Sequence, residues 1–197
     1  MTTQRVVYTA LFGGYEALVE QPVAAESDVP FICFTDDPTL TSESWQIRVV
    51  DPVLPTDPVR SARHLKLIGD DEIRRFAESL WIDNSVALAV DPTSVLDAWL
   101  QSDSIAMPLH SYRRSVIAEF QEILLMGLDD PTRIYEQLAH YSLTYASTLD
   151  AVPIWTALIA RRHGEQSDRF GRVWRDHVFR YSRRDQLSVR VAQQVLA

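Results

Sequence analysis

Short apolar runs bounded by turn-forming residues dominate the first half of the chain. The clearest runs cover residues 5–10, 31–34, 46–50 and 80–82, and they are rich in β-branched and aromatic side chains. Such runs are typical of buried strands. Asp57 and Pro58 supply an N-cap and a first-turn proline, which predict a helix from Pro58 to Lys66. This alternation of strand and helix favours a mostly parallel sheet.

The hydrophobic period changes in the second half. Apolar residues at helical spacing precede Gly127, follow the Asp130–Pro131 pair and recur over residues 170–181, whereas residues 153–161 return to strand-like composition. The stripes before Gly127 and after Pro131 consist of Val116, Phe120, Ile123 and Leu124, and of Ile134, Leu138, Tyr141 and Tyr145. We therefore expect an α/β fold, a Rossmann-like mostly parallel sheet flanked by helices, with an irregular C-terminal half.

Composition narrows the protein class. The chain has 197 residues, of which 46% are hydrophobic and 23% charged, so we expect one globular domain over residues 1–197. Its formal net charge of −8 argues against broad attraction to nucleic acid or to an anionic membrane surface. The single cysteine, Cys33, excludes an internal disulfide and a cysteine-based zinc site. The chain lacks a secretory h-region and any apolar run long enough to span a bilayer, so we expect a cytoplasmic protein.

Ligand-binding residue types follow the first two predicted strands. Gly13 and Gly14 would let the backbone approach a ligand at the carboxyl end of the first strand. Asp36, at the tip of the second, is placed for a ribose hydroxyl or a base edge. Each feature has a plain structural alternative, a strand-exit turn and an Asx turn before Pro38.

The helix after Asp57 concentrates positive charge in an acidic chain. Arg60, Arg63 and Lys66 recur at a spacing of three residues, close enough to share one face and to present several donors to a diphosphate. A solvated helix face is the structural alternative.

The fourth predicted strand ends in Asp83-Asn84-Ser85. Hard oxygen ligands at a strand end suit Mn²⁺ or Mg²⁺ held partly by the phosphates of a nucleotide. Because Ser85 is a weak neutral ligand, this metal hypothesis depends mainly on Asp83. An ordinary β-turn is the alternative.

Later segments add further polar candidates. His110, Arg113 and Glu119 could converge on one pocket, or Arg113 and Glu119 could form a surface ion pair. His163 follows an apolar run within a basic cluster. Asp185 begins the last helical stretch, where an N-cap is the plain interpretation. For His177, which lies on an apolar helical face, we expect a hydrogen-bonded core histidine.

Seven blocks in order resemble the TOD/MUCI glycosyltransferase-like domain family, over roughly residues 6–191. The blocks are VVYTALFGGYE, FICFTDD, DPVRSARHLK, SLWIDNSV, the H-x-x-R-x-x-x-x-x-E stretch from His110 to Glu119, IARRH and SRRDQLS. The resemblance implies a single GT-A-like domain. In that fold a nucleotide-sugar lies at the carboxyl ends of the strands, and an acidic strand end helps to hold a divalent metal.

The resemblance also implies roles for individual positions. Asp83 takes the place of the metal-binding acid, with Ser85 beside it, and Asp185 is the candidate catalytic carboxylate on the acceptor side. The nucleotide-sugar would be bordered or bound by Thr9, Gly13, Gly14, Asp36, Arg60, Arg63 and Lys66. The acceptor or donor-sugar pocket would draw on His110, Arg113, Glu119, His163 and Gln186. Asn84-Ser85 departs from the Gly-Asn-like or Asp-x-Asp-like pair expected there, and residues 144–155 lack the expected glycines.

The leading hypothesis is a metal-assisted glycosyltransferase that moves a sugar from a nucleoside-diphosphate-sugar to an acceptor hydroxyl. It requires Asp83 and the cationic helix to face each other across a hollow large enough for a sugar-bearing diphosphate. Two alternatives stay open: a non-catalytic nucleotide-sugar or glycan-binding module, and a metal-dependent hydrolase built on Asp83, His110 and His163.

Overall fold

The computed structural model describes residues 4–196. Its contacts divide the chain into two compact units, which we describe separately. The first unit comprises residues 1–107 and 157–168, and the second comprises residues 108–156 and 169–197. The single domain expected over residues 1–197 stays a prediction.

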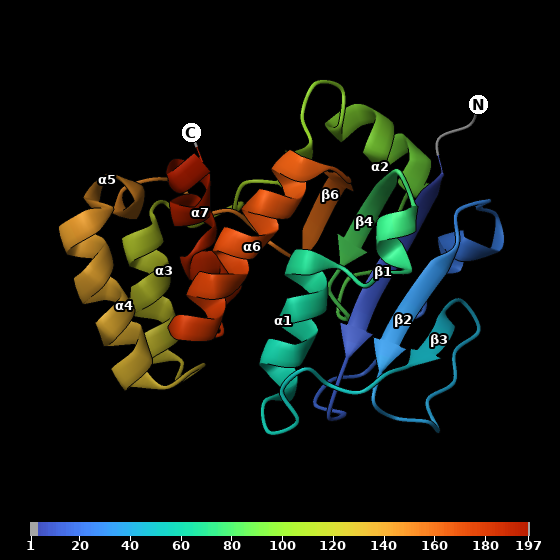
Figure 1. The fold of residues 1–197 in the computed structure, drawn as a ribbon, viewed down its shortest axis with the longest axis horizontal. Coiled ribbons are helices and arrows are strands. Elements are labelled where there is room, and N and C mark those ends of the chain that lie inside the picture. Colours follow the sequence, from blue (N-terminus) through green and yellow to red (C-terminus); the bar gives the residue numbers. More distant parts are fainter. Residues whose placement is uncertain (1–3, 197) are drawn as a thin grey trace. The chain divides into compact units, whose positions relative to one another are not determined.

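A six-stranded mixed sheet organises the first unit, in the order β3-β2-β1-β4-β6-β5 (Figure 1). The strands are β1 (Arg5–Leu11), β2 (Phe31–Thr35), β3 (Gln46–Val49), β4 (Glu78–Ile82), β5 (Ile105–Ala106) and β6 (Leu158–Arg162). β3, β2, β1 and β4 run parallel, whereas β6 is antiparallel to both β4 and β5. The structure therefore confirms the mostly parallel α/β sheet and its four N-terminal strands. The strand-like run at residues 153–161 is a strand only from Leu158 onward.

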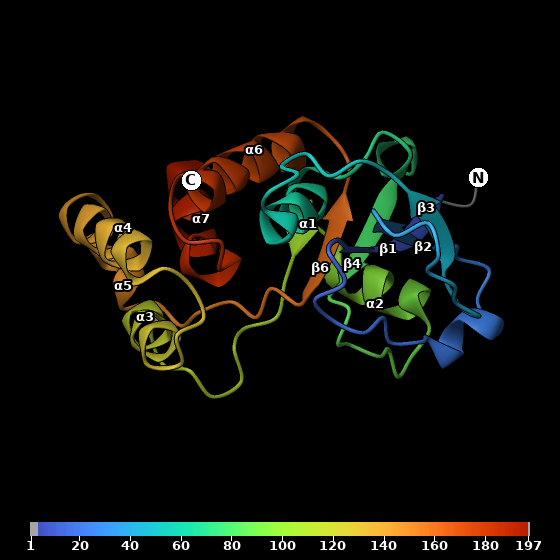
Figure 2. The ribbon, with the colours of Figure 1, turned by 90° about the horizontal axis from the view of Figure 1, so that it is seen from below.

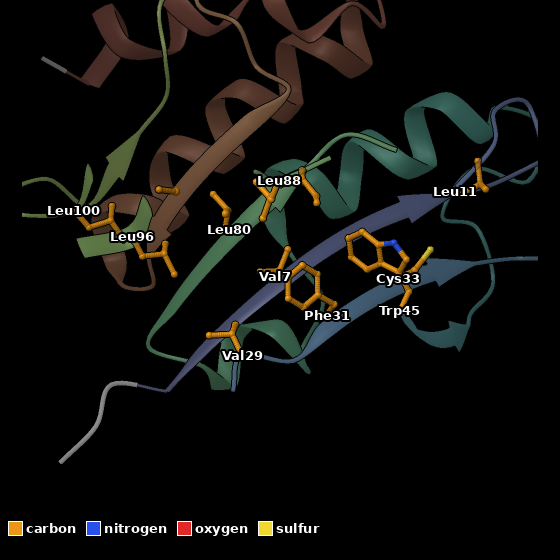
Figure 3. Close-up of a cluster of buried hydrophobic side chains, with 12 residues drawn as sticks. Val7, Leu11, Val29, Phe31, Cys33, Trp45, Leu80, Leu88, Leu96 and Leu100 are labelled. Carbon is orange, nitrogen blue, oxygen red and sulfur yellow. The ribbon is translucent and has the colours of Figure 1, made fainter. Parts of the chain in front are cut away.

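Alternate residues of the central strands pack on opposite faces of the sheet. On one face, Val7 and Leu80 join a buried cluster with Cys33 and with Leu96 of α2 (Pro92–Trp99) (Figure 3). Helix α1 (Pro58–Ile68) covers the other face, where the Tyr8 hydroxyl donates to the carbonyl of Lys66 over 3.3 Å. Figure 2 shows α1 and α2 on opposite sides of β4. Cys33 is the expected buried thiol, and burial raises its pKa to about 12.

Local signals explain where α1 begins and ends. The Asp57 side chain accepts a hydrogen bond from the backbone of Arg60, and Pro58 occupies the first turn. The helix ends at Gly69, whose φ of 79° is readily adopted only by glycine. The structure confirms the expected helix and extends it from Lys66 to Ile68. Short 3₁₀ helices η1 (Pro22–Ala25) and η2 (Ile73–Arg75) complete this unit.

The second unit is helical rather than irregular, and its helices include those predicted by the apolar stripes before Gly127, after Pro131 and over residues 170–181. It contains α3 (Val116–Leu125), α4 (Pro131–Thr144), α5 (Ala146–Leu149), the later part of α6 (Glu165–Arg180), η3 (Asp185–Leu187) and α7 (Val189–Leu196) (Figure 1). Its core includes Phe120, Ile134, Tyr141 and Val191. The Tyr141 hydroxyl lies 2.7 Å from Nδ1 of His177, so His177 is a hydrogen-bonded histidine as expected.

Candidate functional site

The candidate site lies where β1, β2 and β4 end and α1 begins, within the first unit. Parallel strands bring their carboxyl ends to one edge of the sheet. The strand order reverses at β1, because β2 lies on one side of β1 and β4 on the other. Such a reversal of strand order is where open α/β sheets bind ligands.

The Gly13–Gly14 turn and Asp36 lie together at this edge. The backbone N–H of Gly13 donates to both Asp36 carboxylate oxygens, over 2.9 and 3.2 Å. Gly13 has φ of +68° and Gly14 of +58°, and a Cβ on Gly13 would lie 3.0 Å from Pro58. The turn thus requires glycine at position 13, and Asp36 holds the turn in place. Contact of Asp36 with a base or ribose stays a prediction.

The side chain of Asn84 points into the protein, and no local sequence pattern predicts this orientation. Its Oδ1 accepts from the Thr9 hydroxyl over 2.8 Å, and its Nδ2 donates to the Ala10 carbonyl over 3.2 Å. Thr9 and Asn84 are both buried. This pairing of β1 with the residue after Asp83 fixes the direction in which Asp83 points, and it leaves Ser85 exposed.

Asp83 is the centre of a compact charge cluster. Its Oδ1 accepts from the Lys66 ammonium over 3.0 Å and from the indole N–H of Trp81 over 2.7 Å. A guanidinium nitrogen of Arg63 lies 4.0 Å from the same oxygen. The side chain of Lys66 is 0% exposed and that of Asp83 is 24% exposed. The acid and the cationic helix therefore face each other, in direct contact.

A small pocket opens beside this cluster. It has a volume of about 30 Å³ and is lined by Ala10, Tyr15, Glu16, Arg63, Trp81, Asp83, Asn84 and Ser85. Small-molecule sites occupy about 300–1,000 Å³, so within this unit the pocket falls short of the hollow expected for a sugar-bearing diphosphate. A larger pocket of about 280 Å³ lies along α1 and is lined by Ser61, His64 and Leu65, among others. None of the residues predicted to bind a ligand lines it.

Two sequence-predicted residues of the first unit have structural partners of their own. Arg60 forms an ion pair with Asp57, the N-cap of its own helix. His163 Nε2 lies 2.9 Å from the Ser79 hydroxyl, near the amino end of β4. Asp83 follows four residues later, roughly 13 Å along an extended strand. His163 and Asp83 thus lie near opposite ends of β4, which argues against the hydrolase hypothesis. Burial, followed by the charge of Arg161, lowers the pKa of His163 to about 4.

His110, Arg113 and Glu119 come together in the second unit as an ion-pair cluster. Arg113 Nε donates to Glu119 over 3.0 Å, a second guanidinium nitrogen of Arg113 lies 3.0 Å from Glu122, and the Arg113 backbone donates to His110 Nδ1 over 3.2 Å. Glu119 is 5% exposed, so this pair is partly buried rather than a solvated surface pair.

Asp185 and Gln186 also belong to the second unit. They lie in η3, so Asp185 is not the N-cap of α7, which begins at Val189. Asp185 is buried, and its carbonyl accepts from the Trp174 indole over 2.9 Å. Their roles toward a substrate stay predictions.

Comparison with known proteins decides the family. Residues 1–197 match the model described as TOD1/MUCI70, glycosyltransferase-like domain. The chain belongs to this family. It is 27% identical over 218 residues to the probable hexosyltransferase MUCI70 of Arabidopsis thaliana. That alignment covers 98% of this chain and 37% of the relative, so the chain spans little more than a third of the curated relative's length.

Solved structures confirm the GT-A-like fold of this TOD1/MUCI70 family member. The chain is similar to the WbbM bifunctional glycosyltransferase, with a TM-score of 0.53, 9% identity, and coverage of 96% of this chain and 38% of that one. The mannosyltransferase Ktr4p from S. cerevisiae gives a TM-score of 0.52, 8% identity, and coverage of 97% and 65%. Core-mannan synthase A from Aspergillus fumigatus, in its Mn/GDP form, gives a TM-score of 0.52 and 9% identity, with coverage of 96% of this chain and 69% of that one. At these identities the likeness establishes the fold alone.

Proposed function

We propose that this glycosyltransferase-like protein transfers a sugar from a nucleoside-diphosphate-sugar donor to an acceptor hydroxyl. One observation carries the proposal: the Gly13–Asp36 turn and the Asp83–Lys66–Arg63 cluster lie at the carboxyl ends of adjacent strands, where the strand order reverses. Family membership and the GT-A-like fold support it.

No helix of residues 4–196 is long and apolar enough to cross a bilayer. A cytoplasmic location stays a prediction.

The chemistry that these residues supply is charge stabilisation of the leaving group. A departing nucleoside diphosphate gains negative charge as the bond to the sugar breaks, and fixed cations lower the barrier by stabilising that charge. Arg63 lines the pocket beside Asp83, and Arg60 lies one turn nearer the start of α1.

The predicted Mn²⁺ or Mg²⁺ site at Asp83 and Ser85 does not fit the side chains present. Core-mannan synthase A, a structural neighbour, has been solved in a Mn/GDP form. In this chain, however, Oδ1 of Asp83 already accepts from Lys66 and Trp81. Asn84 points inward, and the described residues contain no group of three or more His, Cys, Asp or Glu side chains that could hold a metal ion. We therefore route no catalytic step through a metal.

A second candidate function is a nucleotide-sugar or glycan-binding module without turnover. The ion pairing of Asp83 and the neutral Ser85, where an acid is expected, favour this alternative. The transferase and a nucleotide-sugar-binding module both predict nucleotide binding, a glycan-binding module does not, and only the transferase predicts donor cleavage.

Donor cleavage can be tested without knowledge of the acceptor. The protein is incubated with UDP- and GDP-sugars, and release of the nucleoside diphosphate is measured. We expect release from one donor class and its loss in Arg63→Gln. The matched control is Arg133→Gln, which removes an arginine paired with Glu136 on the exposed surface of α4 and should leave the rate unchanged. Binding of nucleotide without release from any donor would favour the non-catalytic module. Neither binding nor release would contradict the transferase and a nucleotide-sugar-binding module alike.

A further inference from the structure

We propose that this protein binds and cleaves its donor without a divalent cation, because the Lys66 ammonium holds the position beside Asp83 that such a cation would need. This inference rests on the proposed transferase function. It concerns the positive charge that stabilises the diphosphate. Side chains of the protein would supply this charge in place of a metal ion.

Lys66 is a built-in cation of the site. Its side chain is 0% exposed, its Nζ lies 3.0 Å from Asp83 Oδ1, and the same atom lies 5.6 Å from the ring centre of Trp81. A fully buried ammonium is stable only when a carboxylate or several acceptors compensate it. Asp83 is therefore committed to an ion pair within the fold.

A divalent cation at Asp83 would meet both electrostatic and geometric obstacles. Mg²⁺ binds oxygen ligands at about 2.1 Å and prefers six of them, so it would lie within a few ångströms of the ammonium. Like charges so close in a partly buried pocket repel strongly. The neighbouring ligand positions are poor, because Asn84 Oδ1 is engaged by the Thr9 hydroxyl and Ser85 offers a neutral hydroxyl.

Arg63 and Lys66 together can take over the task of the metal. Both cations approach the same oxygen, Asp83 Oδ1, at 4.0 and 3.0 Å. Arg63 also lines the pocket, where its planar guanidinium can present two N–H groups to phosphate oxygens. Glu16 is the other carboxylate that lines this pocket, and it is exposed to solvent.

Calorimetric titration of the full chain with GDP and with UDP tests the inference, once in excess EDTA and once in excess Mn²⁺. We expect one of the nucleotides to bind in both buffers with dissociation constants within about threefold of each other. Binding that needs Mn²⁺, or that tightens by roughly tenfold or more with it, would overturn the metal-independent mechanism and leave the proposed transferase standing. No binding of either nucleotide in either buffer would overturn both.

Titration with Mn²⁺ alone, followed by water-proton relaxation, gives a readout that does not depend on activity. The wild-type chain should bind no Mn²⁺ at Asp83, so Asp83→Asn should leave the Mn²⁺ titration unchanged. Lys66→Met removes the ammonium at similar side-chain length, so it should strengthen any Mn²⁺ binding at Asp83 relative to wild type, and Glu16→Gln should reverse that gain. Should Lys66→Met fail to fold, the comparison of wild type with Asp83→Asn still decides the question. Mn²⁺ binding in the wild type that Asp83→Asn abolishes would overturn the inference.

Discussion

The Asp83–Lys66 pair makes a prediction about stability that is independent of any ligand. Asp83→Asn keeps an oxygen that can accept from the Trp81 indole and removes the negative charge opposite Lys66. The ammonium is fully buried, so it cannot exchange the lost carboxylate for water without movement of α1. The substitution should therefore destabilise the folded state.

The size of the effect follows from the exposure of the pair. A hydrogen bond to a charged group contributes about 1.5–3 kcal/mol, and removal of one partner from a fully buried pair costs about 3–5 kcal/mol. Because Asp83 is 24% exposed, its charge is partly solvated, and we expect a cost near the lower range. A loss of about 2 kcal/mol would lower the melting temperature of a chain of this size by roughly 4–8 °C.

Urea unfolding measures this change as a lower midpoint at an unchanged slope. Arg133→Gln breaks an exposed pair on α4 and should cost no more than about 0.5 kcal/mol. The double variant Lys66→Met/Asp83→Asn should recover part of the loss, because it removes both charges together. An equal urea midpoint for Asp83→Asn and Arg133→Gln would show that the ion pair does not stabilise the fold, contrary to this prediction.

Three further predictions concern the same unit. The pKa of His163 is lowered to about 4 in the folded protein, so the imidazole stays neutral there above that pH. In the unfolded chain it takes up a proton below about pH 6.5. The free energy of unfolding should therefore fall by up to about 3 kcal/mol as the pH is lowered from 6.5 to 4. Urea unfolding across this window checks it, and an equal pH dependence in His163→Gln would contradict it. Gly13→Ala and Gly14→Ala should each lower the free energy of unfolding by about 1–2 kcal/mol, because both positions have a positive φ. Gly13→Ala should lower it more, because only that substitution adds a Cβ 3.0 Å from Pro58. Equal unfolding midpoints of the two variants would refute this. Glu78→Gln weakens ion pairs to two arginines, so it should cost about 3 kcal/mol while leaving nucleotide affinity in calorimetry unchanged.

The sheet could be predicted because its signals are local. β1, β2 and β4 are short apolar runs ending in turn formers, and the Asp57 cap marks the start of α1 within a few residues. The second unit was harder to predict. Helix α6, whose later part belongs to this unit, begins at Glu165, before the apolar repeat that starts at residue 170. The expected irregular half is helical because helices can be polar outside the stripe that packs on a core.

For the candidate site, the sequence could predict only which residues lie at the ends of the strands. The sequence indicates that Asp83 and α1 lie at one edge of the sheet, because parallel strands end together. It could not show that Lys66 is buried against Asp83, since helical spacing gives the direction of a side chain and not its depth. The Thr9–Asn84 hydrogen bond joins residues 75 positions apart, and no local pattern reports such a contact.

The central claim is that the donor nucleotide binds at the Gly13–Asp36 turn and the Asp83–Lys66–Arg63 cluster of the first unit. NMR titration of ¹⁵N-labelled protein with GDP and UDP tests this claim most directly. We predict that amide shifts concentrate at Gly13, Asp36, Arg63 and Ser85, with little change near Glu78 at the opposite end of β4. Shifts that cluster elsewhere, or a spectrum that neither nucleotide alters, would contradict the account.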